Sequence, residues 1–88
     1  MDSWYKVEVH RAHFGSGKDQ RTIAYMFVKD PMEALIRYKT MPGVKRDKIP
    51  NILPVSDRKS KEVEENIIQE KRISLNVAKK TWYYSKRI

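Results

Sequence analysis

The sequence predicts a small α+β protein: a three-stranded, mainly antiparallel sheet with one packed helix and a longer charged helix near the carboxyl end, in the chain order β-β-α-β-α. Two stretches of alternating apolar side chains, a proline-marked helix start and a proline-containing apolar segment support this class. At 88 residues the chain can enclose only one core. We expect a single domain, with residues 1–72 as its core and residues 73–88 as a basic aromatic extension.

The amino-terminal part predicts a β-hairpin. Apolar and charged side chains alternate in residues 4–10 and again in residues 21–29, which is the two-residue period of a half-buried strand. Between them, residues 15–19 form a small, turn-forming cluster. We expect the next helix to cover the apolar face of the hairpin, with three aromatic side chains in that core: Tyr5, Tyr25 and Phe27.

A helix start follows the hairpin. Asp30 is a suitable N-cap, Pro31 takes the first helical position, where its missing N–H is harmless, and Glu33 can complete a capping box. The helix is expected to span residues 31–41, until Pro42 and Gly43 end it. One broad apolar stripe on it can pack on the hairpin: Ala34, Leu35, Tyr38 and Met41.

Residues 49–55 predict a third strand, which is interrupted by Pro50 and Pro54. Residues four apart in a strand direct their N–H groups to the same side, so both missing donors can face solvent. We therefore expect this strand at an edge of the sheet. The prolines would also discourage the addition of further strands there.

A second helix is expected after Ser56 or Asp57, either of which can cap it. Beyond Arg72 two patterns compete. If the helix continues to about residue 80, Val63, Ile67, Leu75, Ala78 and Trp82 share one face; alternation of Ile73, Leu75 and Val77 would instead suit a strand. The long helix is favoured, because residues 78–80 are poor turn formers.

Charge is concentrated at the carboxyl end. The last eighteen residues hold six of the 19 lysines and arginines and none of the 11 carboxylates, out of a net charge of +8. The chain has no cysteine, no secretory signal pattern and no apolar run long enough for a membrane span. We therefore expect a soluble, cytoplasmic, basic protein whose partner is a polyanion, and RNA is the most abundant one there.

The basic aromatic segment is the candidate binding site. Trp82 or Tyr83 could stack on unpaired bases, while the cations neutralise phosphates. Alternatively, the aromatics pack in the core and the charges merely solvate the surface. The expected phosphate-binding side chains are Lys71, Arg72, Lys79, Lys80, Lys86 and Arg87, assisted by the loop residues Lys45, Arg46 and Lys48.

Two other motifs are weaker indications of function. Residues 15–18 read Gly-Ser-Gly-Lys, but a phosphate-binding loop needs a glycine at position 12 and a following helix, and this chain has Ala12 and a strand. His10 and His13 are the only candidates for acid–base chemistry, and a strand would place them on opposite faces. No metal or cofactor is expected.

These observations favour a non-catalytic RNA-binding protein that serves as a component or accessory of a ribonucleoprotein. One alternative is an interaction module that docks on an acidic protein surface. The second is a small histidine-dependent ribonuclease or toxin, in which His10 or His13 would act as a general base.

The order of hairpin, helix, basic turn and edge strand resembles the archaeal large-subunit ribosomal protein LX. The residues that carry this likeness are 30–34 (Asp-Pro-Met-Glu-Ala), 43–46 (Gly-Val-Lys-Arg) and Ile49. These are common residue types, and nothing in the likeness covers the basic aromatic segment. No function is inferred from it.

Overall fold

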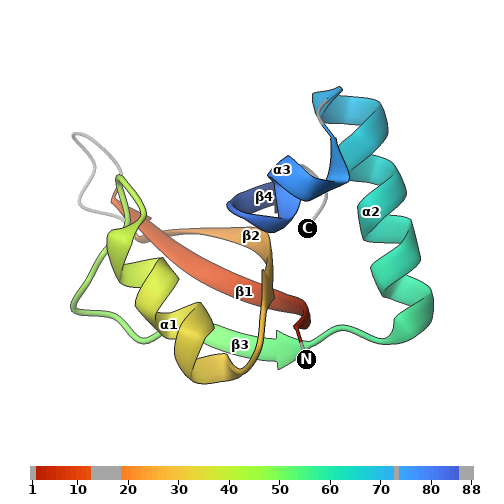
Figure 1. Ribbon diagram of the computed structural model, residues 1–88. Helices are drawn as coiled ribbons and strands as arrows, with labels where there is room; N and C mark the ends of the chain where they lie inside the picture. Colours follow the sequence, from red (N-terminus) through yellow and green to blue (C-terminus); the bar gives the residue numbers. More distant parts are fainter. Residues whose placement is uncertain (1, 13–18, 73, 86–88) are drawn as a thin grey trace.

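The structure is a computed structural model that describes residues 2–12, 19–72 and 74–85 (Figure 1). In this part of the chain, four strands form one antiparallel sheet in the order β3-β1-β2-β4, with helices on both faces. The elements are β1 (Ser3–Ala12), β2 (Asp19–Val28), α1 (Pro31–Thr40), β3 (Asn51–Pro54), α2 (Asp57–Lys71), α3 (Leu75–Lys79) and β4 (Trp82–Ser85).

The α+β class is confirmed, but the expected three-stranded sheet is wrong by one strand. Residues 73–88, which we expected to form a basic aromatic extension, instead contain β4. This strand pairs with β2 from Ile23↔Ser85 to Met26↔Trp82. The central hairpin is confirmed, with β1 and β2 paired from Ser3↔Val28 to Ala12↔Asp19. Residues 13–18, which include most of the expected turn, lie outside the described part.

The first core lies between the sheet and α1. Asp30 caps this helix by accepting a hydrogen bond from the Glu33 N–H at 2.9 Å, and Pro31 opens it, as predicted. The expected stripe is confirmed: Ala34, Tyr38 and Met41 are fully buried, and Leu35 packs beside them. The strand residues in this core are Val7, Val9, Ala24, Met26 and Val28.

The second core lies on the opposite face, under α2 and α3. It consists of Trp4, Tyr25, Val63, Ile67, Ala78 and Tyr83, with Phe27 at its margin. The expected location of Tyr25 and Phe27 under the first helix is therefore wrong. Both faces of β2 are apolar, so alternation alone could not tell which set faces α1, and the pairing of Tyr5 with Met26 decides it.

The predicted edge strand is confirmed, although it is shorter than expected. β3 pairs with β1 from Tyr5↔Pro54 to Glu8↔Asn51 and has no other partner among the described strands. Pro50 precedes the strand and Pro54 is its last residue, which removes two backbone donors at this edge.

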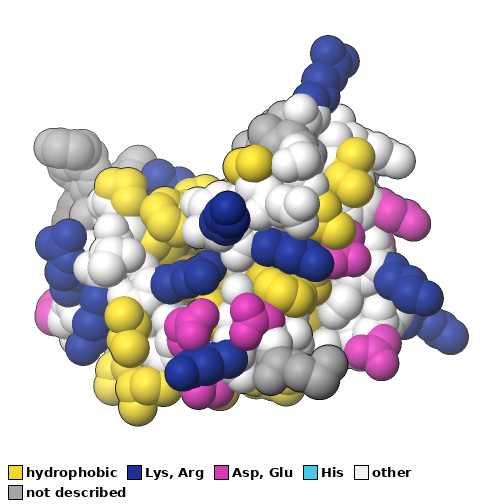
Figure 2. Space-filling view, viewed as in Figure 1, with side chains coloured by type: hydrophobic (Ala, Val, Ile, Leu, Met, Phe, Trp, Pro, Cys, Tyr) yellow, Lys and Arg dark blue, Asp and Glu magenta, His cyan; other side chains and the backbone are white. Residues whose placement is uncertain are grey.

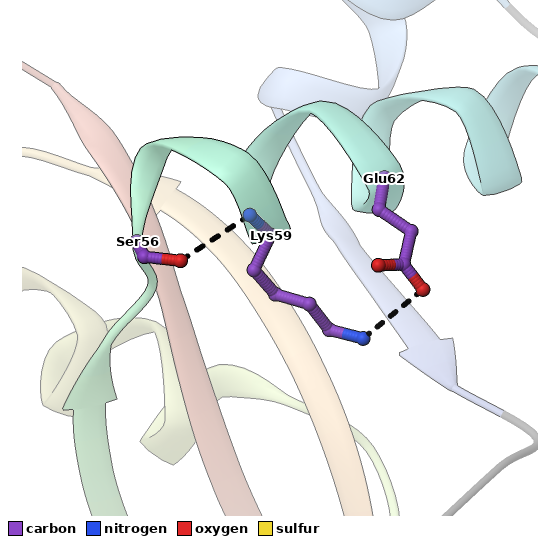
Figure 3. Close-up of polar contacts among 3 residues, drawn as sticks. All are labelled: Ser56, Lys59 and Glu62. Carbon is purple, nitrogen blue, oxygen red and sulfur yellow. Dashed lines mark hydrogen bonds and ion pairs between the residues drawn. The ribbon is translucent and has the colours of Figure 1, made fainter.

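Local polar contacts fix the start of α2 (Figure 3). The Ser56 hydroxyl accepts from the Lys59 N–H at 3.3 Å, which confirms Ser56 as the N-cap. The Lys59 ammonium also lies 3.3 Å from a carboxylate oxygen of Glu62. Both side chains of that pair are half-exposed, so the ion pair itself contributes only about 0.3–0.5 kcal/mol.

The continuous helix to residue 80 is wrong. α2 ends at Lys71, and Arg72 takes a left-handed conformation with φ 53° and donates its N–H to the Ile68 carbonyl. The chain then reverses, and Ser74 caps the short α3. A helix continuing past Arg72 would leave the apolar side chains beyond it in solvent, whereas the reversal buries Ala78 and Tyr83 in the second core.

The described residues contain neither a membrane-spanning helix nor a metal-binding cluster. No helix in residues 2–12, 19–72 and 74–85 is both long and apolar enough to cross a membrane. Within the same ranges, no group of three histidine, aspartate or glutamate side chains is placed to hold a metal ion.

Candidate nucleic-acid interface

A basic cleft opens where the two helical layers meet at the sheet edge. It is a shallow hollow of about 590 Å³, largely open to solvent, and is lined by Asp2, Phe27, Arg37, Asn76, Lys79 and Lys80. Figure 2 shows dark-blue side chains gathered in the middle of this face, between α1 and α3 as placed in Figure 1. We call this the α1–α3 cleft. Three of its side chains are cationic and one is a carboxylate.

The topology of the sheet explains why an opening exists here. β4 pairs with β2 only as far as Met26, so Phe27 and Val28 extend beyond the start of β4. The last turn of α1 supplies Arg37 from one layer, and the end of α3 supplies Lys79 from the other. The cleft is thus composite: neither helix alone carries its charge.

Arg37 carries an unsatisfied donor. Its Nη2 lies 3.7 Å from a Glu33 carboxylate oxygen one helical turn away. Its Nη1 is buried and has no hydrogen-bond partner among the described residues. Because a buried donor without an acceptor is unfavourable, the guanidinium would be stabilised by turning outward to an anionic oxygen in the cleft.

Lys79 is held at the cleft by an aromatic ring. Its ammonium lies 4.6 Å from the centroid of Phe27, a cation–π contact. Phe27 in turn packs edge-on against the buried Trp4, with centroids 5.3 Å apart. Lys80, the next residue, is exposed.

The two aromatic residues expected to stack on bases have different environments. Tyr83 is only 6% exposed, lies against Tyr25 with ring centroids 6.5 Å apart and donates its hydroxyl to Glu70. Its ring is therefore used within the second core. Trp82 is half-buried and packs at the margin of the first core.

A cation–aromatic contact not expected from the sequence lies further along β4. The Arg11 guanidinium sits 5.1 Å above the ring of Tyr84. Burial raises the pKa of the Tyr84 phenol, while the charge of Arg11 and a hydrogen bond with the Trp82 side chain act in the opposite direction. Arg11 itself is exposed.

The basic loop is well anchored. The Lys45 N–H donates to the His10 carbonyl at 2.7 Å, and the Lys45 carbonyl accepts from the buried Tyr38 hydroxyl at 2.8 Å. Arg46 donates through Nε to the Lys39 carbonyl at 2.9 Å, and Lys48 is exposed.

The β1 end of this loop lies far from the α1–α3 cleft. It bridges to β1 at Arg11, whereas the cleft contains Asp2 at the other end of the same strand. Nine residues of extended chain span roughly 30 Å. The β1 end of this loop is therefore remote from the Asp2 end of the cleft, while Arg46 reaches α1 at Lys39, two residues beyond Arg37.

The other expected site residues are distributed as follows. Arg72 is exposed at the end of α2. Lys86, Arg87 and the side chain of Lys71 lie outside the described part of the chain, as does His13. His10 is half-buried in β1.

Sequence reasoning missed Arg37 and Asn76 and assigned Phe27 to the core. The one available signal for Arg37 was its position on the flank of the stripe formed by Ala34 and Tyr38, which places a helical side chain at the margin of a core. Arg37 faces the end of α3 only because the chain reverses at Arg72, which the sequence did not indicate.

Comparisons with protein-family models, with curated proteins and with solved structures found no match. The resemblance to protein LX therefore gains no support.

Proposed function

We propose that this protein binds nucleic acid without catalysis, RNA in preference to DNA, as a component or accessory of a ribonucleoprotein. The observation that supports this most is the convergence of Arg37, Lys79 and Lys80, from two helices on opposite faces of the sheet, on one cleft. Convergent cations separated widely in the sequence form a more specific feature than a run of lysines in a solvated segment.

The three cations have different roles. The Arg37 guanidinium, whose buried Nη1 lacks an acceptor, turns outward to donate to a phosphate oxygen, whereas the lysine ammonium groups act as flexible point charges. Each neutralised phosphate releases counterions, so affinity falls with salt. Arg72, Lys71, Lys86 and Arg87 remain in the proposal as further phosphate contacts.

Docking on an acidic protein surface is the second candidate. Met32 and Ile36 are 64% and 58% exposed, one turn apart on the outer side of α1. Exposed apolar side chains next to cations suit a protein surface better than a phosphate backbone.

A salt-dependent titration tests the proposal. Fluorescence anisotropy would compare single-stranded RNA, single-stranded DNA and duplex DNA over a salt series. Each phosphate that the protein neutralises on a single strand should add about −0.7 to the log–log slope of affinity against salt. Binding of an acidic protein with no measurable affinity for any polynucleotide would support the second candidate instead.

Charge reversal locates the surface. The double variant Lys79→Glu, Lys80→Glu should abolish RNA binding. Its matched control is Arg58→Glu, Lys61→Glu, which makes the same change in net charge on exposed residues of α2 and should retain most of the affinity. Equal losses in both variants would show that only the total charge matters, and an unaffected cleft variant would refute the site.

A further inference from the structure

Phe27 makes the α1–α3 cleft more than a cluster of charges. Its half-buried ring lines the same opening as Arg37, Lys79 and Lys80. Its inner side is supported by Trp4, which is 2% exposed, so the ring is held in place. A fixed aromatic surface beside cations is the combination that binds a base together with its phosphate.

We propose that the cleft holds one nucleotide of a single-stranded segment, with the phosphate at Arg37 and the lysines and the base on the ring of Phe27. This inference rests on the proposed function and adds the substrate class: unpaired rather than duplex nucleic acid. The hollow has a volume of about 590 Å³ and is largely open to solvent, so it can hold one unit of a strand whose neighbours stay outside. A base within a duplex cannot enter it, because its faces are covered by stacked neighbours.

The contact between Lys79 and Phe27 must be broken before a base can stack on the ring. In the free protein the Lys79 ammonium lies over the face of the Phe27 ring. A phosphate offers Lys79 a charge-assisted hydrogen bond, which is stronger than a solvent-exposed cation–π contact. When the ammonium moves to the phosphate, the ring becomes available to the base.

The other lining side chains limit the occupant to a single unit. The carboxylate of Asp2 repels a second phosphate, so a backbone running the length of the cleft is disfavoured. The Asn76 amide can both donate and accept, which suits the edge of a base or a ribose hydroxyl.

The test removes the ring and leaves the charge. Affinities of the full chain for a short oligouridylate, for an RNA duplex and for inorganic phosphate would be measured by anisotropy and calorimetry. Phe27→Leu should weaken oligouridylate binding about tenfold. It should leave phosphate and duplex binding unchanged, and Phe27→Trp should raise oligouridylate affinity above that of the wild type.

A second aromatic residue serves as the control. Tyr84→Leu removes a half-buried ring that does not line the cleft, and oligouridylate affinity should stay as in the wild type. Thermal unfolding would show whether each variant is folded. If Phe27→Leu does not fold, Phe27→Trp still decides, because a larger ring at a stacking site raises single-strand affinity, whereas at a mere packing position it leaves that affinity unchanged.

The outcomes separate this inference from the proposed function. Unchanged oligouridylate affinity in folded Phe27→Leu, with binding still lost in the Lys79→Glu, Lys80→Glu variant, would overturn the nucleotide site and leave nucleic-acid binding intact. Equal weakening for duplex and single strand would overturn it too. Absence of binding to every polynucleotide would refute the proposed function, and this inference with it.

Discussion

At the scale of single residues, two carboxylates of α2 have structural roles. Glu64 accepts from the Trp4 indole N–H at 3.1 Å, and Glu70 accepts from the Tyr83 hydroxyl. Each satisfies the polar atom of a buried aromatic side chain, which would otherwise lose its hydrogen bond with water. Glu64 and Glu70 therefore serve the second core, on a helix that does not line the α1–α3 cleft.

Tyr84 gives a prediction about pH. Its pKa is raised above the ordinary value of 10.0 by burial, so the folded state resists ionisation. The unfolded chain loses this proton first as pH rises, and the stabilisation from Tyr84, complete below pH 10.0, is lost above it. Denaturant unfolding over alkaline pH should show a smaller decline for Tyr84→Phe than for the wild type.

The difference between the tyrosinate absorbance curves of the two proteins would check the assignment. A Tyr84 transition at or below 10.0 would contradict the burial that we describe. The comparison with Tyr84→Phe removes the contribution of the other tyrosines.

Residue chemistry also marks what was predictable. Asp30 acts through its immediate neighbours and was identified correctly from the sequence, and Ser56 was one of the two caps expected for α2. The edge position of β3 was also predicted from its prolines. The end of α2 was not, because the left-handed cap falls on Arg72, where the usual glycine signal is missing. The α1–α3 cleft depends on that reversal, so its composition could not be derived from local patterns.

At the scale of elements, α2 acts as the cover of the second core. Val63 and Ile67 bury one face of the helix, while the neighbouring Ile68 is 48% exposed. Most of the remaining side chains on this helix are polar and exposed. Its attachment to the sheet therefore depends on few apolar contacts, and α3 and β4 follow it in the chain.

This dependence predicts a large effect of truncating Ile67. Ile67→Ala should reduce the free energy of unfolding by about 3 kcal/mol, because the side chain is fully buried. Ile68→Ala is the matched control and should cost less than about 1 kcal/mol. Urea titration followed by tryptophan fluorescence would measure both. Similar losses in the two variants would mean that α2 is not seated as described.

At the scale of the whole molecule, one sheet separates two cores, and its central strands take part in both. β1 and β2 are each flanked by strands on both sides, whereas β3 and β4 are short edges of four residues. Stability should therefore be highest in the middle of the sheet and lower towards its edges.

Amide hydrogen exchange should report this gradient. The slowest amides are expected at Val7, Val9, Ala24 and Met26, whose side chains are fully buried, with faster exchange at β3 and β4. Nuclear magnetic resonance under native conditions would resolve the strands. Protection of β4 equal to that of β1 would indicate that the sheet opens only as a unit.

The pairing of β2 with β4 has a kinetic consequence. The hairpin of β1 and β2 forms from adjacent segments. The pairing of Met26 with Trp82 instead joins residues that lie far apart in the chain. Closing so long a loop costs chain entropy before the contacts between β2 and β4 can compensate for it. During ribosomal synthesis the hairpin leaves the exit tunnel well before its last partner strand, so the α1–α3 cleft is assembled late, after most of the sheet already exists.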